Sequence, residues 1–420
     1  MKKIIFILVL LLSLVSLFAK EFSFVVMGDN RPTYKYQPYV YYKITKQIAA
    51  LKPDFIVSTG DIIMGHTDDS DEINSMYREF EDASKAISYL PLYIAPGNHE
   101  ETDESKLKPI FLKYFKNTYQ AFPYQDSYFI ILNSNEPGEK YQIAGVQFKW
   151  LKKQLKKIRV SKDPEYKHIF VFLHHPLYPK VHHIGASLDK LPDQRDKLAE
   201  LLKEYNVESV FTGHVHIFNE SIVNGLHQYI IGGAGAPLYG KGYKDGSFNH
   251  FMLVTVNGDD TNYSIFPVEN DLEDAISDYF AGNNDGAQLH LANAVKFMPK
   301  HPEVLFTRYL LVKDETLLKE DILKIISKTL GSDFDAYMGL GHFLNNHKLS
   351  DDALELFKKA IEVNSTDQEP YFRVAQIYEK DKDSVNAIFY YKKALKYTKK
   401  GNYILYVMKK LKKLQGGKLK

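Results

Sequence analysis

Short apolar runs alternate with helix-like stretches through the first 267 residues, and this alternation restricts the fold more than any other feature of the sequence. The strand-like runs lie at 22–27, 55–59, 92–95, 128–132, 168–173 and 209–212, and Tyr229–Ile231 and Phe251–Val256 look like closing strands. Stretches with helical spacing of apolar residues lie at 38–51, 72–88, 145–158 and 194–205. Apolar strands that alternate with helices form sheets buried on both faces. The sequence therefore predicts an α/β front domain.

After about Asp271 the strand-like runs end and a helical pattern begins to repeat. Ala353, Phe357 and Ala360 recur 34 positions later as Ala387, Tyr391 and Ala394. This period, with its small and aromatic residues, resembles the tetratricopeptide repeat. The resemblance implies an all-α helical-repeat domain with a concave surface for a protein or peptide partner, closed by a capping helix near 404–414. An unrelated helical bundle is the alternative.

The N-terminus has the pattern of a signal peptide. Lys2 and Lys3 precede an apolar run from Ile4 to Phe18, and Ala19 ends it before Lys20. The run is short for a membrane span of about 20 residues, although an uncleaved anchor is the alternative. We expect cleavage after Ala19, export to the periplasm or the medium, and no membrane span in the mature chain.

These features divide the chain into a signal peptide at 1–19, a front domain at 20–267 and helical repeats at 268–420. The composition narrows the chemistry. There is no cysteine, which excludes disulfides and thiolate metal ligands. Lys and Arg number 54 and Asp and Glu 52, so the net charge of +2 indicates no specific nucleic-acid binding.

Five short motifs carry the chemistry, and each follows a strand-like run. They are Gly28-Asp29-Asn30, Gly60-Asp61, Gly97-Asn98-His99-Glu100, Leu173-His174-His175-Pro176 and Gly213-His214-Val215-His216. Ligands in open α/β sheets bind at the carboxyl ends of the strands, so these side chains are expected to converge. Their oxygen and nitrogen donors suit divalent or trivalent metal ions.

The five motifs in this order resemble the calcineurin-like metallophosphoesterase superfamily, on the branch near the purple acid phosphatases. The likeness covers most of 22–266 and includes the segment with Gln147, Trp150 and Leu151 and the loop Gly232–Pro237. It implies a two-sheet β-sandwich flanked by helices. It also implies a phosphate-ester substrate and two metal ions, which would be Mn, Fe or Zn.

The resemblance also implies a role for each motif residue. Asp61 would bridge both metals, Asp29 and His216 would bind the first, and Asn98, His174 and His214 would bind the second. A hydroxide shared by the metals would attack phosphorus, while the metals neutralise charge on the phosphoryl oxygens. His99 would protonate the leaving oxygen or hydrogen-bond the phosphate, unless it only supports its neighbours.

Two positions depart from the family pattern. Many relatives carry a metal-binding histidine where this chain has Arg31, and purple acid phosphatases carry a tyrosine where it has Met64. The first metal therefore has fewer assigned ligands, and the purple colour of a tyrosinate complex is not expected. Arg31 would fork onto substrate phosphate or pair with a carboxylate; the two readings are equally supported.

Two functions of different class follow. The first is an exported metal-dependent phosphoesterase, a binuclear phosphatase or phosphodiesterase. The second is a scaffold whose repeats bind a protein while the metal site is degenerate or weakly active. No predicted ligand lies beyond residue 270, so we expect removal of the repeats to spare hydrolysis of small substrates.

Overall fold

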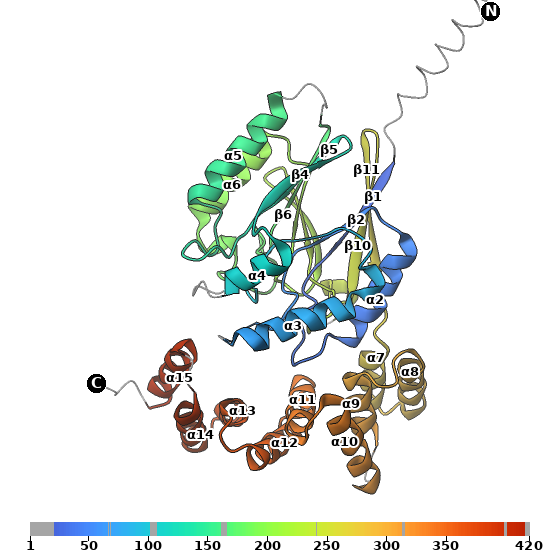
Figure 1. Cartoon of the computed structure of the whole chain (residues 1–420), viewed down its shortest axis with the longest axis vertical. Coiled ribbons are helices and arrows are strands. Elements are labelled where there is room, and N and C mark those ends of the chain that lie inside the picture. Colours follow the sequence, from blue (N-terminus) through green and yellow to red (C-terminus); the bar gives the residue numbers. More distant parts are fainter. Residues whose placement is uncertain are drawn as a thin grey trace, which may run out of the picture. The chain divides into compact units, whose positions relative to one another are not determined.

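Two mixed β-sheets pack against each other in the front part of this computed structural model, and helices follow (Figure 1). The structure describes residues 21–65, 67, 69–100, 107–160, 166–240, 242–312, 316–398 and 401–415. It divides into two compact units. The front unit comprises residues up to Pro32 and Val40–Glu269, and the helical unit comprises Thr33–Tyr39 and the chain from Asn270 onward.

The first sheet has the strand order β11-β10-β1-β2-β3. Its strands are β1 (Phe22–Met27), β2 (Phe55–Ser58), β3 (Leu92–Ile94), β10 (His250–Asn257) and β11 (Asp260–Pro267). β1, β2 and β3 are parallel, and β10 runs antiparallel to both of its neighbours.

The second sheet has the order β4-β5-β6-β7-β9-β8. Its strands are β4 (Gln120–Tyr124), β5 (Ser127–Ile131), β6 (His168–Phe172), β7 (Ser209–Thr212), β8 (Phe218–Val223) and β9 (Leu226–Ile231). The four central strands are parallel, whereas β4 and β8 pair antiparallel at the two edges.

β1 shows why both faces of the sheets must be apolar. Phe24 and Val26 lie in the core between the sheets, whereas Val25 lies in the core under the outer helices. Phe129 of β5 meets Phe24 edge-on across the inner core, with ring centroids 5.1 Å apart. The helices are α2 (Tyr39–Leu51), α3 (Ser70–Ala83) and α4 (Leu107–Phe115) on the first sheet, and α5 (Gly145–Val160) and α6 (Pro192–Glu204) on the second. The predicted two-sheet β-sandwich flanked by helices is confirmed.

The sequence did not indicate the edge strands β4, β8 and β11 or the helix α4. These strands are partly exposed, so they lack the continuous apolar run of a central strand. β4 also contains Pro123, which has no N–H to donate and is tolerated at a sheet edge.

The helical unit consists of consecutive antiparallel helices, as the repeat pattern predicted. They are α7 (Asp271–Phe280), α8 (Asn284–Phe297), α9 (Pro302–Leu311), α10 (Thr316–Leu330), α11 (Asp333–Asn346), α12 (Ser350–Val363), α13 (Gln368–Lys380), α14 (Ser384–Tyr397) and α15 (Gly401–Leu414). The small residues of the repeat allow close packing. A Cβ atom on Gly341 of α11 would lie 2.8 Å from the Phe357 ring of α12. Ala353 and Ala387 are both fully buried.

The helical unit also includes a segment that the sequence had placed in the front domain at 20–267. We call this segment, Thr33–Tyr39, the strap. Its Tyr36 packs among apolar residues of α7, α9 and α11, and Tyr39 packs among those of α7, α8 and α9. The strap therefore belongs to the helical unit because its aromatic side chains are buried there.

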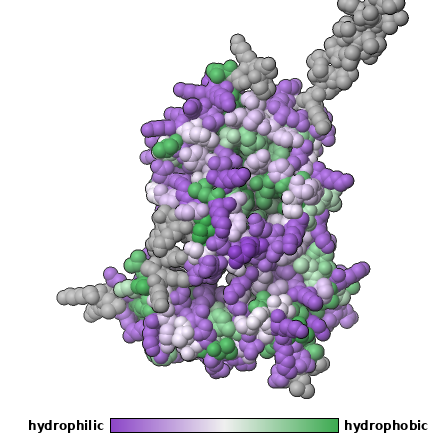
Figure 2. Space-filling model, in the orientation of Figure 1, coloured by the Kyte–Doolittle hydropathy of each residue, from purple (hydrophilic) through white to green (hydrophobic). Residues whose placement is uncertain are grey.

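The surface in Figure 2 is mainly hydrophilic, and hydrophobic residues form small separate patches on the face shown. Within the described residues, no helix combines the length and the apolar character needed to cross a bilayer. The predicted signal peptide at 1–19 lies outside the described residues.

Candidate metal centre

The five motifs follow the carboxyl ends of β1, β2, β3, β6 and β7. These are the parallel strands of the two packed sheets, so their carboxyl ends face the same side. Asp29, Asp61 and His214 all adopt left-handed backbone conformations, with φ of 60°, 55° and 68°. Such conformations cost about 1–3 kcal/mol each and concentrate at functional sites.

Glycines let the motif loops approach one another closely. A Cβ atom on Gly97 would lie 2.1 Å from Asp61 Oδ1, and one on Gly213 would lie 2.3 Å from Asp29 Oδ2. Any side chain at either position would therefore displace a carboxylate. These glycines bring the loops after β3 and β7 into contact with the two aspartates.

Three predicted ligands converge around a fourth, His174. Its Nε2 atom lies 3.0 Å from Asn98 Oδ1, 3.2 Å from His214 Nδ1 and 3.5 Å from Asp61 Oδ1. Ligand atoms about 2.0–2.2 Å from one metal ion lie at this kind of spacing from each other. The structure thus brings together the residues that the resemblance assigned to the second metal.

Backbone carbonyls fix the tautomers of the two facing histidines. His174 Nδ1 lies 2.9 Å from the Thr59 carbonyl oxygen, and His214 Nε2 lies 3.1 Å from that of Ala186. A carbonyl oxygen only accepts, so each of these nitrogens must carry the proton. His174 Nε2 and His214 Nδ1 then present lone pairs to each other at 3.2 Å, where no hydrogen bond joins two neutral rings. A cation between them satisfies both, so the residues fit a metal ion.

The residues assigned to the first metal lie together as well. His216 Nε2 is 3.5 Å from Asp29 Oδ1, and His216 Nδ1 donates to the Pro237 carbonyl oxygen at 2.6 Å. The ring of His216 stacks on Tyr239, with centroids 4.5 Å apart and planes 4° apart. Asp29, Asp61 and His174 also offer one donor atom each within 4.8 Å of one another.

Burial keeps the histidines neutral and opposes charge on the aspartates. It lowers the pKa of His174 to about 4 and that of His216 to about 3. It raises the pKa of Asp61 to about 6 although Arg31 acts in the opposite direction. Burial also raises the pKa of Asp29 well above its usual value, together with the nearby Asp61 charge. Neutral imidazoles bind metals directly, and paired buried carboxylates are stabilised in their charged form by a cation.

Glu100 is a functional neighbour that the sequence interpretation gave no role. Its carboxylate accepts hydrogen bonds from the backbone N–H groups of Asp61 at 2.7 Å, Ile62 at 2.8 Å and Gly97 at 2.8 Å. It is fully buried, and burial raises its pKa to about 7 against the effect of these donors. Glu100 holds the loop of Asp61 against the loop of Asn98. Its place in the motif after His99 was the one available signal.

His99 and Arg31 both lie beside Asp61. His99 Nδ1 donates to the Met64 carbonyl oxygen at 2.5 Å, and its Nε2 faces Asp61 Oδ2 at 3.7 Å. Arg31 Nε lies 3.9 Å from the same oxygen, and Arg31 Nη1 donates to the Met64 sulfur at 3.8 Å. The Arg31 Nε atom is buried and makes no hydrogen bond. The Nε–H group of Arg31 therefore faces the cluster of predicted metal ligands.

Two further histidines border the cluster. His175 lies with its ring centroid 4.4 Å from that of His214, and its Nδ1 is 3.0 Å from Ser134 Oγ. His175, His174 and His214 form a second group able to hold a metal ion. His183 lies in the loop after β6, with its ring 4.2 Å from His214. The structure places both residues beside the predicted ligand His214.

Metal removal should lower stability more at high pH than at low pH. The pKa of Asp61 is raised, so the stability it contributes to the metal-free fold is complete below about pH 4 and is lost as the pH rises through about 6. A bound cation stabilises the charged carboxylate and so restores this stability. Above about pH 6 the cation no longer competes with protons for Asp61. We expect the Tm difference between metal-loaded and chelated protein to grow from pH 5 to pH 8, reaching about 5–10 °C at saturating metal.

The measurement is thermal unfolding of metal-loaded and chelated samples at the same pH. Histidines elsewhere titrate equally in both samples, so their contribution cancels in the Tm difference. The Asp61→Asn variant is the control, since its metal-dependent shift should be small at every pH. A shift that is as large at pH 5 as at pH 8 would contradict the proposed pairing of carboxylates and metal.

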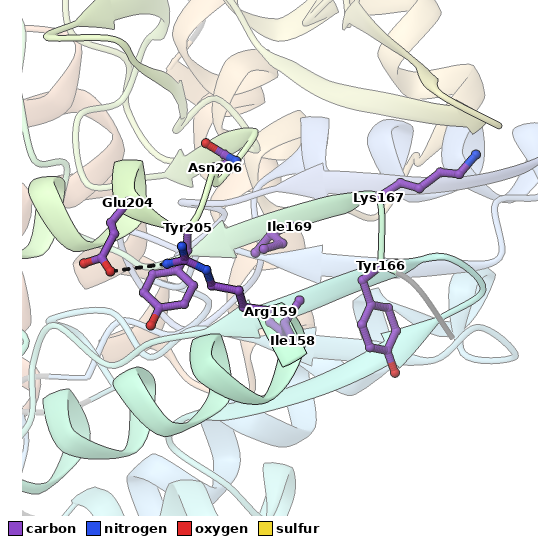
Figure 3. Close-up of a pocket in the computed structure, with 8 residues that line it drawn as sticks. All are labelled: Ile158, Arg159, Tyr166, Lys167, Ile169, Glu204, Tyr205 and Asn206. Atoms are coloured by element: carbon purple, nitrogen blue, oxygen red, sulfur yellow. Dashed lines mark ion pairs between the residues drawn. The ribbon is translucent and has the colours of Figure 1, made fainter. Parts of the chain in front are cut away.

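A hollow in the front unit lies away from these residues (Figure 3). It has a volume of about 270 Å³ and is lined at the start of β6 and the ends of α5 and α6. Arg159 and Glu204 form an ion pair at its wall, with a nitrogen–oxygen distance of 3.5 Å. It lies at the amino ends of the parallel strands, opposite to the metal-ligand cluster.

Comparisons with known proteins agree with the site. Residues 22–218 match the family described as calcineurin-like phosphoesterase, and residues 368–400 match the tetratricopeptide repeat. The chain is 30% identical over 178 residues to a probable glycerophosphodiester phosphodiesterase, GpdQ, of Arcobacter nitrofigilis. The aligned region covers 41% of this chain and 60% of that relative. It is 28% identical over 212 residues to Fe(3+)-Zn(2+) purple acid phosphatase 12 of Arabidopsis thaliana, covering 43% of this chain and 42% of the relative.

Among solved structures, a dimetal phosphatase from Danio rerio aligns with a TM-score of 0.39 and 13% identity, over 59% of this chain and 99% of that one. The chain spans about 60% and 42% of the length of the two curated relatives. The matched family covers the segment that contains all six predicted metal ligands. The chain therefore contains a domain that matches the calcineurin-like phosphoesterase family, followed by a helical region in which one segment matches the tetratricopeptide repeat.

Proposed function

We propose that this chain is an exported phosphoesterase that holds two metal ions and hydrolyses phosphate esters. The facing lone pairs of His174 and His214, 3.2 Å apart beside Asn98, are the observation that carries the proposal. Neutral ring nitrogens held in this arrangement need a cation between them. The nearby carboxylates of Asp29 and Asp61 add the negative charge that a second cation requires.

Each residue then has a definite task. Asp61 contacts both groups of ligands, Asp29 and His216 hold the first ion, and Asn98, His174 and His214 hold the second. Two such ions, when bound, supply an activated water and neutralise charge on the phosphoryl oxygens. Arg31 directs its unused Nε–H at the phosphate, and His99 offers Nε2 to the leaving oxygen.

The test is hydrolysis by the full chain of p-nitrophenyl phosphate and bis(p-nitrophenyl) phosphate with added Mn²⁺, Zn²⁺ or Fe²⁺. One relative is named a phosphodiesterase and the other an acid phosphatase, so the panel contains a diester and a monoester. Activity should vanish with a chelator and return with metal. His174→Ala should lose metal and activity, whereas His227→Ala, at the partly exposed His227 on β9, should retain both.

A second function, a scaffold with a degenerate site, is favoured by Arg31 and Met64, which stand where relatives have metal donors. In that case the chain would bind metal yet hydrolyse neither substrate. A metal-loaded chain that is inactive on both esters, with the His227→Ala control folded, would support the scaffold and overturn the phosphoesterase.

Export predicts a defined N-terminus. The apolar run Ile4–Phe18 followed by Ala19 should direct cleavage, so the mature chain should begin at or near Lys20. Intact-mass measurement of protein from the periplasm or medium tests this. A full-length chain found in the cytoplasm would contradict it.

A further inference from the structure

The strap, Thr33–Tyr39, lies along the first helices of successive pairs in the helical unit. Its hydrogen-bond and ion-pair partners are Asp271 of α7, His301 and Glu303 at the start of α9, and Asp335 of α11. α7, α9 and α11 each open one helix pair. Stacked helical pairs commonly bind extended peptides along such a row of helices. In this chain the occupant is a segment of the chain itself.

Main-chain contacts fix the second half of the strap. The Gln37 carbonyl oxygen accepts a hydrogen bond from His301 Nε2 at 3.0 Å, and the Tyr39 N–H donates to Glu303 Oε2 at 2.8 Å. Gln37 is 1% exposed and Tyr39 is fully buried. Buried backbone groups of an extended segment need such partners, and here the helices supply them.

Side chains fix the first half. Tyr34 Oη donates to Asp335 Oδ1 at 2.8 Å, and Lys35 Nζ contacts the same oxygen at 2.6 Å. The Tyr34 ring stacks on His342 with centroids 5.3 Å apart, and the Tyr36 ring meets Phe306 at 5.7 Å. Asp335 is therefore the point at which two strap side chains are held.

The strap begins two residues after Arg31. Only Pro32 separates them, and its ring restricts the backbone between them. The main-chain N–H of Arg31 donates a hydrogen bond to the Asp61 carbonyl oxygen at 2.8 Å. The backbone of Arg31 is therefore tethered to the Asp61 loop directly and to the strap through Pro32.

We propose that the helical repeats bind the strap as an internal peptide ligand and thereby position Arg31 toward the substrate phosphate. Asp335 is then a positioning residue although it follows the last metal ligand by more than a hundred positions. The kinetic part of this inference rests on the proposed function. The binding of the strap by the helices does not.

The test compares Asp335→Ala with Glu379→Ala in the full chain. Glu379 lies on α13 and, like Asp335, accepts from a tyrosine hydroxyl and a lysine: Tyr391 Oη of α14 at 2.6 Å and Lys410 Nζ of α15 at 3.0 Å. Hydrogen–deuterium exchange of peptides covering 33–39 should rise in Asp335→Ala and stay at the wild-type level in Glu379→Ala. Asp335→Asn keeps an oxygen that accepts from Tyr34 Oη, so it should restore much of the protection.

The kinetic arm is a double-mutant cycle with Arg31→Ala on p-nitrophenyl phosphate. Asp335→Ala should lower kcat/KM, by up to about 10²-fold for a displacement near 1 Å, mainly through a higher KM. In the Arg31→Ala background the same change should have no further effect, because the residue acts through Arg31. Equal losses in both backgrounds would overturn the positioning role.

If Asp335→Ala does not fold, Tyr34→Ala removes the same contact from the strap side and takes its place. Unchanged exchange of 33–39 in the folded variant would overturn the inference, whatever the activity. Wild-type protein that hydrolyses no ester but shows the predicted exchange would instead count against the proposed function alone. The two failures are therefore distinguishable.

Discussion

Under the proposed function, replacing Asp61 with asparagine should lower kcat/KM about 10³-fold or more on each phosphate ester tested. Asp61 lies 3.5 Å from His174 Nε2 and belongs with Asp29 to the group of donors within 4.8 Å. Metal ions contribute several kcal/mol to transition-state stabilisation, and each 1.36 kcal/mol is a factor of ten in rate. In the proposed two-metal site Asp61 is shared, so its replacement should weaken both sites at once and metal content should fall as well.

Asparagine is the most informative replacement for Asp61 because it can keep the hydrogen bond with the His99 main chain. Asp61 Oδ1 accepts from the His99 N–H at 3.0 Å, and the amide oxygen can do the same. The loss is then attributable to charge and to the missing second oxygen. Asp54→Asn is the matched control, since Asp54 accepts from Ser23 N and Tyr124 Oη and lies away from the cluster. Kinetics with metal analysis measure both variants, and a variant that keeps two metals and near-normal kcat/KM would remove Asp61 from the bridging position.

The arrangement of the motifs could be predicted because it depends on local patterns. Runs that are apolar on both faces marked the central strands, and Asp29 and His214 follow two such strands directly. Parallel strands with intervening helices place their carboxyl ends on one side, so the motifs had to converge. Edge strands such as β4 and β8 escaped prediction because their exposed faces interrupt the apolar pattern.

The groups that orient the ligands could not be predicted from residue types. The carbonyl oxygens of Thr59, Ala186 and Pro237 set the tautomers of His174, His214 and His216. Every residue has a carbonyl group, so the sequence does not distinguish these three. Only the folded backbone shows which carbonyls face a ring nitrogen and therefore which nitrogen is left to bind a metal.

The strap escaped prediction because its partners are distant in sequence. Most of Thr33–Tyr39 lies between the strand-like run at 22–27 and the helix-like stretch at 38–51, yet Tyr34 and Asp335 are hydrogen-bonded across 301 positions. This contact also changes the expectation that the repeats can be removed without consequence. Their loss would expose Tyr36 and Tyr39, which the helices bury, and release the segment next to Arg31. A truncated front domain should therefore be less stable and less active than the absence of metal ligands in the repeats suggested.

Replacing His99 with alanine should separate proton donation from metal binding. His99 Nδ1 donates to the Met64 carbonyl oxygen, so Nε2 is the atom presented to the cluster, with the side chain 8% exposed. The acid role therefore requires the imidazolium form, in which Nε2 also carries a proton and lies 3.7 Å from the Asp61 carboxylate. An alkoxide leaving group needs a proton as its bond to phosphorus breaks, whereas a nitrophenolate hardly does. His99→Ala should therefore lose about 10²–10⁴-fold in kcat/KM on alkyl phosphates and much less on p-nitrophenyl phosphate.

The companion variants decide between the roles of His99. His99→Gln can donate a hydrogen bond to phosphate but cannot transfer a proton, so it should resemble His99→Ala if the residue is an acid and the wild type if it only positions phosphate. His214→Ala should lose metal and fall on every substrate, because its Nδ1 faces His174 Nε2 directly. Equal losses on both leaving groups in His99→Ala, with both metals retained, would exclude the acid and leave phosphate positioning. Loss of a metal would make His99 a ligand, and Met64 would then act by orienting it through the carbonyl that now holds Nδ1.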